Sequence, residues 1–149
     1  MSIIPEDEQY DINLRNTDGQ LFSAVVKLHD RYWIENNLSH VECRIILKWA
    51  GVELESVESD YFEAFCRIRE ELAKRNLLPV CYGASRRIII SGMGRDMGAG
   101  LMVYKVLPDN SISIKHLVNI FDTGDDVEPV SVEAQSQFQQ AWLEANSKR

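Results

Sequence analysis

The stretch Val41-Glu42-Cys43-Arg44-Ile45-Ile46-Leu47-Lys48-Trp49 alternates between apolar and charged side chains. Successive side chains of a strand point to opposite faces of a sheet, so this alternation predicts a strand with one buried and one solvated face. Ile46 breaks the pattern, and the alternation resumes after Gly51, over residues 52–55. A second strand is predicted over residues 21–28, which are rich in apolar and β-branched side chains.

Two segments have the spacing of amphipathic helices. In the first, apolar side chains recur at intervals of four, three and four residues and share one side of a helix: Tyr61, Phe65, Ile68 and Leu72. Ser56 or Ser59 is expected to cap its N-terminus, and Asn76 with Pro79 marks its end. The second helix is predicted to begin after a Ser131 cap. Its apolar face consists of Ala134, Phe138, Ala141, Trp142 and Ala145.

Four short strands are predicted between these helices, over residues 77–82, 87–90, 101–107 and 113–121. Strands in a block with helices at either side favour an α+β fold, with a mainly antiparallel sheet packed against two amphipathic helices. A chain of 149 residues with 45% hydrophobic side chains has enough material for one core, so residues 1–149 are predicted to form a single domain. Residues 1–19 are expected to be an irregular arm.

The composition favours a cytoplasmic protein without a cofactor. No apolar run reaches the roughly 18 residues that a membrane span needs, and the acidic N-terminus lacks the pattern of a signal peptide. Cys43, Cys66 and Cys81 are an odd set without Cys-x-x-Cys spacing, which predicts buried, reduced thiols. The three histidines are scattered along the chain, so we expect no metal site.

The net charge of −7 is unevenly distributed. Residues 67–105 carry eight basic and three acidic side chains, whereas the rest of the chain carries eight basic and twenty acidic ones. An acidic surface disfavours nucleic acid and favours a basic protein partner. The alternative is that most of these charges lie on solvated faces and serve solubility.

Residues 92–100 contain four glycines, with Arg95 and Asp96 at their centre. The segment matches neither the Gly-x-Gly-x-x-Gly fingerprint nor a phosphate loop, although Arg86, Arg95 and Asp96 could form a small anion-binding site. The alternative is a tight loop in which Arg95 pairs with Asp96. In either case Gly94 or Gly98 is expected to need a backbone conformation closed to β-branched residues.

Three groups of residues are candidate contact surfaces. The Ile120–Gly124 stretch has the Asp-Thr-Gly pattern of aspartic proteases, but too little chain follows it, so an acidic turn is favoured. This turn could present carboxylates to a basic partner or simply be solvated: Asp122, Asp125 and Asp126. A second possible acidic patch consists of Glu53, Glu55 and Glu58. The aromatic pair Tyr32 and Trp33 interrupts a polar connection and could be an exposed contact surface.

A partial resemblance adds to this interpretation. Residues 82–85, 91–93, 95–98, 100–101 and Tyr104 resemble small bacterial immunity proteins that accompany secreted polymorphic toxins of the contact-dependent inhibition type. The resemblance implies a cytoplasmic, non-enzymatic antidote that binds one cognate toxin domain and blocks its active site. Such toxins are often nucleases with basic surfaces, which an acidic inhibitor suits. The basic middle of the chain does not fit a uniformly acidic binding face.

Two other hypotheses stay open. One is a small anion- or nucleotide-binding domain, or an enzyme, built on Arg86, Arg95, Asp96 and the glycine backbone of residues 92–100. The other is a subunit of a larger bacterial assembly. The sequence leaves the oligomeric state undetermined.

Overall fold

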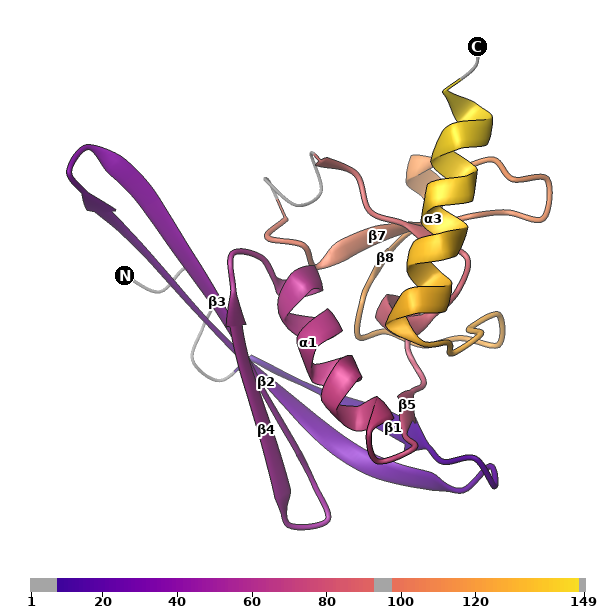
Figure 1. Ribbon diagram of the computed structural model, residues 1–149, viewed down its shortest axis with the longest axis horizontal. Helices are drawn as coiled ribbons and strands as arrows, with labels where there is room; N and C mark the ends of the chain where they lie inside the picture. Colours follow the sequence, from indigo (N-terminus) through magenta and orange to yellow (C-terminus); the bar gives the residue numbers. More distant parts are fainter. Residues whose placement is uncertain (1–7, 93–97, 148–149) are drawn as a thin grey trace.

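The computed structural model describes residues 8–92 and 98–147. Strands form two antiparallel sheets, one of five strands in the order β4-β3-β2-β1-β5 and one of three strands in the order β6-β7-β8. Helix α1 lies against the five-stranded sheet, and α3 lies beside α1 (Figure 1). In chain order the elements are β1 (Gln9–Arg15), β2 (Leu21–Glu35), β3 (Leu38–Trp49), β4 (Val52–Glu58), α1 (Tyr61–Ala73), β5 (Leu78–Pro79), the 3-10 helix η1 (Tyr82–Ala84), β6 (Ile88–Ile89), β7 (Met102–Lys105), the 3-10 helix η2 (Ile114–His116), β8 (Leu117–Asn119) and α3 (Val132–Asn146).

The predicted α+β class and the mainly antiparallel sheet are confirmed. The alternation in residues 41–49 also holds, since Cys43, Ile45 and Leu47 are buried on the side that faces α1, whereas Val41 is exposed. The strand after Gly51 is a separate strand, β4, because Ala50 and Gly51 both adopt positive φ angles and reverse the chain.

The expectation of an irregular arm over residues 1–19 is wrong for residues 9–15. These form β1, which pairs with β2 along its whole length and with β5 at its end. Ile12 and Leu14 are buried and alternate with exposed Asp11 and Asn13, a short strand pattern that the polar composition obscured. Residues 1–7 lie outside the described part of the chain.

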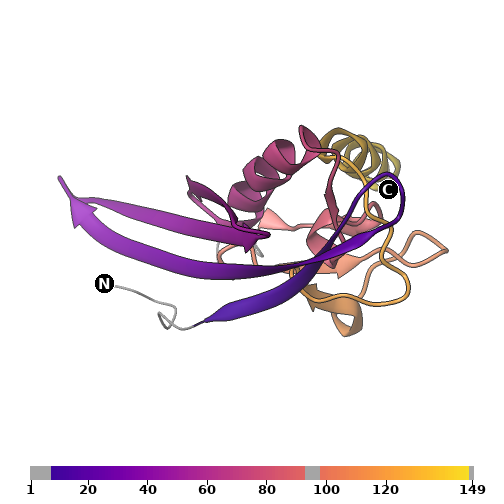
Figure 2. The ribbon, with the colours of Figure 1, turned by 90° about the horizontal axis from the view of Figure 1, so that it is seen from below.

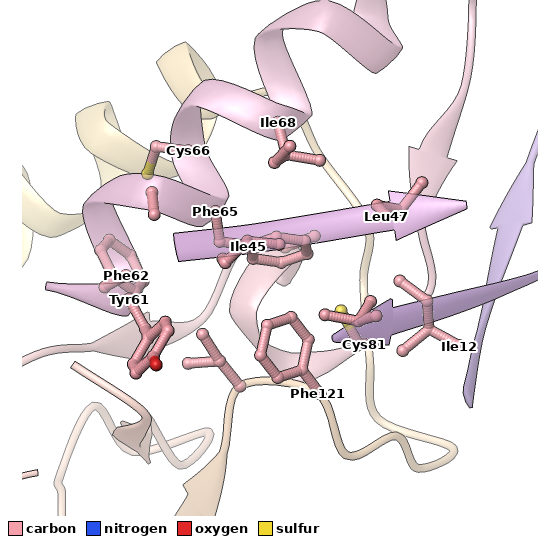
Figure 3. Packing of buried hydrophobic residues seen from close by; sticks show 14 of the residues in the cluster. Ile12, Ile45, Leu47, Tyr61, Phe62, Phe65, Cys66, Ile68, Cys81 and Phe121 are labelled. Carbon is pink, nitrogen blue, oxygen red and sulfur yellow. The ribbon is translucent and has the colours of Figure 1, made fainter. Parts of the chain in front are cut away.

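Helix α1 carries the predicted apolar stripe, but its N-cap lies one residue after Ser59, the nearer of the two expected caps. Its N-cap is Asp60, whose Oδ1 accepts a hydrogen bond from the Glu63 amide at 2.7 Å. Ser56 cannot serve as the cap because it lies within β4, where its hydroxyl donates to the Ala64 carbonyl at 2.6 Å. The stripe meets the sheet in a close-packed core, in which the Phe65 and Phe121 rings lie edge to face at 5.0 Å (Figure 3).

Two predicted strands are much shorter in the structure. Of residues 77–82 only Leu78 and Pro79 form a strand, β5; the Val80 amide still donates to the Asn13 carbonyl at 2.8 Å, and the chain then turns into η1. Residues 113–121 begin with η2, where the Ser113 hydroxyl accepts from the Lys115 amide and favours a turn, so that only β8 remains extended.

Helix α3 has the predicted Ser131 cap, whose hydroxyl accepts from the Ala134 amide at 3.1 Å. Its predicted apolar face is only half-buried at best, and Ala141 and Ala145 on that face are exposed. The one residue of α3 that is buried is Gln135, which is polar. Gln135 is buried because it accepts a hydrogen bond from a buried guanidinium on α1.

That guanidinium belongs to Arg69, which is only 3% exposed. Its Nη1 donates to the Gln135 Oε1 at 2.7 Å and to the Gly83 carbonyl at 3.1 Å, and its Nη2 donates to the Val130 carbonyl at 3.0 Å. Gln135 in turn donates to the carbonyls of Gly83 and Ser85. Burial lowers the pKa of Arg69, and no carboxylate among the described residues hydrogen-bonds to it. The network joins α1, η1 and α3.

All three cysteines lie within the described residues, are buried, and form no disulfide, as predicted. Burial raises the pKa of Cys43 to about 12 and that of Cys81 to about 12, far above the ordinary value near 8.5 for a cysteine. Because the thiolate is the reactive form, both side chains act as apolar packing groups and not as nucleophiles.

The Arg69 network yields a stability prediction. Replacing Arg69 by methionine keeps the volume but leaves the Val130 carbonyl and the Gln135 amide oxygen without their donor. We expect the free energy of unfolding to fall by about 2–4 kcal/mol, since a buried polar group without a partner costs about 1–3 kcal/mol. Urea denaturation measures this. The control is Arg67→Met on the same helix, whose ion pairs are at the surface and whose loss should change little. Equal stability of the two variants would contradict the role given to Arg69.

Candidate protein-interaction surface

Strands β2 and β3 extend well beyond the rest of their sheet. β1 pairs with β2 only as far as Lys27, and β4 pairs with β3 only as far as Cys43. Beyond these points residues 29–42, here called the hairpin arm, form a two-stranded ribbon that projects from the body of the protein (Figures 1 and 2). Asn36 and Asn37 at its tip have positive φ angles of 53° and 65°, which suit the tight turn that joins two twisted strands.

Tyr32 and Trp33 lie in this arm and not in the polar connection that was predicted. The prediction failed because Asp30 and Arg31 interrupt the apolar run after Leu28, although the chain remains extended through Glu35. Pairing with β3 supplies the hydrogen bonds that keep these polar residues in a strand, and this long-range contact has no local signal.

The two faces of the arm differ in chemistry because adjacent residues point to opposite sides. One face continues the side of the sheet that α1 covers elsewhere, and its outer part carries Tyr32, Ile34, Ser39 and Val41. We call this the neutral face. The other face, here called the stacked face, carries Arg31, Trp33, Glu35, Leu38, His40 and Glu42.

The stacked face is internally ordered. Trp33 and His40 are directly opposite in the ladder, and their rings stack with centroids 5.1 Å apart and planes inclined by 16°. The Arg31 guanidinium lies 4.4 Å from the centre of the Trp33 ring and 3.5 Å from Glu42 Oε1. Stacking and ion pairing therefore hold a large aromatic side chain in one orientation on an exposed arm.

At the base of the arm the side chains become buried. Asp30 is 6% exposed, and Cys43 opposite it donates from its Sγ to the Ser59 carbonyl at 3.8 Å. Tyr61, also buried, has its pKa raised mainly by desolvation, and its hydroxyl has no hydrogen-bond partner among the described residues. Because their pKa values are raised, Cys43 and Tyr61 stay protonated and serve as packing groups, and neither is an activated nucleophile.

The acidic patch on β4 is neutralised by its neighbours. Glu53 lies 3.4 Å from Lys48, Glu55 lies 3.0 Å from Arg44, and Glu58 lies 3.7 Å from Arg67, measured between the charged nitrogen and oxygen atoms. Exposed pairs of this kind still attract a partner, but less than unpaired carboxylates do. The three glutamates lie on the sheet edge, away from the acidic turn at residues 122–126 (Figure 1).

The acidic turn is divided between structural and solvated carboxylates. Asp126 accepts a hydrogen bond from the Tyr82 hydroxyl at 2.7 Å and lies 3.1 Å from Lys105 Nζ, and the Tyr82 hydrogen bond is the main reason that its pKa is lowered. Asp122 and Asp125 are exposed and form no ion pair with any other described residue. The turn lies on the opposite side of the protein from the tip of the hairpin arm (Figure 1).

Of the alternative anion site, Arg86, Arg95 and Asp96, only Arg86 lies within the described residues. Arg86 is exposed and lies 3.7 Å from Glu128, whose charge would repel an anion. Arg87 beside it already donates to the Leu107 carbonyl and to Asn110. Arg95 and Asp96, together with Gly94, lie outside the described residues. Within the described part of the glycine segment, Gly100 has a φ of +80° and packs against the start of α1.

An open groove of about 750 Å³ lies between α1 and α3. Its lining contains no histidine or cysteine, and its polar side chains are mostly serines, glutamines and glutamates. Within residues 8–92 and 98–147, no group of His, Cys, Asp and Glu side chains is arranged to hold a metal ion. No helix of that same part of the chain is long and apolar enough to cross a membrane.

The sequence matches no model of a known protein family, and no curated protein matches it. The surfaces described above therefore carry the chemistry from which a function can be proposed. On the hairpin arm, specific contacts hold the half-buried Trp33 and His40 beside the exposed Arg31.

The position of Gly100 yields a second stability prediction. A Cβ at this residue would lie 2.8 Å from the Phe62 amide nitrogen and 2.9 Å from Asp60 Oδ1, which is the helix cap. We expect Gly100→Val to lower the melting temperature by roughly 5–15 °C, because positive φ and the clash with the cap add together. Gly92→Val is the control, since a Cβ there meets nothing within 4 Å. Similar thermal melts for the two variants would show that Gly100 is not constrained.

Proposed function

We propose that this protein acts by binding a partner protein through the hairpin arm, and that it has no catalytic activity of its own. The observation that carries the proposal is the ordered stack of Arg31, Trp33 and His40 on the exposed arm. The arm adds little to the core of the protein, since most of its side chains are exposed or half-buried. A binding role explains why such an arm carries a tryptophan.

The stacked face has the composition of an interaction hot spot. Tryptophan and arginine are over-represented among residues that dominate binding energy. Trp33 is held on both sides, by His40 and by Arg31, so it loses little conformational entropy when a partner covers it. The surrounding charged side chains, Glu35 and Glu42, can form the polar rim that excludes water from such an anchor.

The resemblance to immunity proteins suggests the kind of partner. We propose a cognate secreted toxin domain with a basic surface, neutralised in the cytoplasm of the cell that makes this protein. The net charge of −7 favours encounter with a basic protein. Asp122 and Asp125 add to this long-range attraction, whereas Trp33 anchors the complex once it has formed.

The anchor is tested by comparing how the wild-type protein and Trp33→Ala bind the toxin domain proposed as the partner. We expect at least a tenfold weaker affinity, or about 1.4 kcal/mol or more, which appears mainly as faster dissociation. Surface plasmon resonance measures both rates. Leu143→Ala is the control, because Leu143 is 53% exposed on α3, away from the arm. Unchanged dissociation from Trp33→Ala, with a folded protein by circular dichroism, would overturn the proposed anchor.

The acidic residues should affect a different rate. We expect the combined change Asp122→Asn and Asp125→Asn to slow association roughly two- to fivefold at low salt and to leave dissociation unchanged, because remote charges act on encounter. The difference should vanish as salt is raised. The pair Glu53→Gln and Glu55→Gln removes the same charge from side chains that are already ion-paired and should have the smaller effect. Faster dissociation of the Asn variant would instead place the acidic turn in the interface.

A further inference from the structure

The neutral face of the hairpin arm is an uncovered continuation of the core-facing side of the sheet. Along β2 the residues of this side are buried up to Asp30, after which Tyr32 is 37% and Ile34 is 65% exposed. On β3 the same change occurs between Cys43, which is buried, and Val41, which is 38% exposed. Helix α1 covers the buried part and does not reach the arm (Figures 1 and 2).

We propose that a second copy of this chain covers the neutral face, so that two hairpin arms pack face to face in a homodimer. An isolated two-stranded ribbon is marginally stable in water unless its apolar side is covered. The cover is needed whenever the chain is folded, including before it meets the toxin domain proposed above. A second copy of this chain is available in solution whenever the chain is folded, whereas a different protein would cover the face only while it is bound.

The distribution of charge also favours a second copy of this chain as the occupant of the neutral face. Two chains that each carry a net charge of −7 repel one another, so they can meet most easily where neither presents a charge. Outward from Asp30, the neutral face carries only Tyr32, Ile34, Ser39 and Val41. Its two hydroxyl groups, on Tyr32 and Ser39, lie within hydrogen-bond distance of one another at 3.2 Å. Such a surface is complementary to itself across a two-fold axis.

The size of the face sets the strength of this dimer. The four residues 32–35 of β2, which carry the uncovered part of this face, span about 13 Å at about 3.3 Å per residue. Two strands of this length bury less than the roughly 800 Å² per partner that is typical of stable complexes. We therefore expect a weak dimer, with a dissociation constant on the order of 10–100 μM.

Because the two contacts use opposite faces of the arm, substitutions can disrupt the dimer and partner binding separately. Ile34 and Leu38 are nearly equally exposed, at 65% and 63%, and both lie near the tip of the arm, but they belong to opposite faces. Ile34→Glu places a carboxylate on the neutral face of each copy, where two like charges would be forced together. Leu38→Glu makes the same change on the stacked face and leaves the neutral face intact.

Sedimentation velocity from about 5 μM to about 500 μM tests the proposal. We expect the wild-type protein and Leu38→Glu to sediment faster as concentration rises, and Ile34→Glu to stay monomeric with at least a tenfold larger dissociation constant. Trp33→Ala should still dimerise even if it no longer binds the toxin domain, so failure of the proposed function does not affect this result. A wild-type protein that is monomeric at about 500 μM would overturn the proposal. So would loss of the dimer in Leu38→Glu but not in Ile34→Glu.

Discussion

The buried guanidinium of Arg69 is the interaction on which the assembly of the body depends. It joins three segments that are distant in sequence, since it lies on α1 and donates to Gly83 of η1, to Val130 before α3 and to Gln135 within α3. A buried charge without a carboxylate partner is costly unless neutral oxygen atoms satisfy it. Here two backbone carbonyls and one amide oxygen accept from the two Nη atoms, whereas Nε has no hydrogen-bond partner among the described residues. The network explains why the buried residue of α3 is a polar one, Gln135.

This arrangement separates the protein into a body and an arm. The body is closed, because α1 packs against the five-stranded sheet and the Arg69 network holds α3 and η1 beside it. Beyond Lys27 and Cys43, the strand pairing of the hairpin arm among the described residues is the β2–β3 ladder. A ribbon that leaves the body exposes both of its faces, and side-chain alternation then gives those faces different chemistry. One face has an ordered aromatic anchor, and the other has an uncharged apolar surface, so the same two strands can serve two contacts.

The charges of the protein serve structure more often than their number suggests. The glutamates of β4 lie beside basic side chains of β3 and α1, and Asp126 is tied to Tyr82 and Lys105. The net charge therefore describes how the protein attracts or repels others at a distance, while specific contact depends on shape and on held side chains such as Trp33.

The sequence by itself determined the features that depend on local periodicity. The alternation over residues 41–49, the four-three-four spacing of the apolar residues of α1 and the Ser131 cap all follow from the backbone geometry of a strand or a helix. Tertiary structure alone decided the features that depend on long-range pairing. β1 is a strand because β2 and β5 lie on either side of it, and the polar residues after Leu28 stay extended because β3 pairs with them. Asp60 became the cap of α1 only because β4 continues through Glu58, and Gln135 was buried only because Arg69 reached it. No local pattern could reveal these contacts, since each partner lies on a different element and is brought near only by the fold.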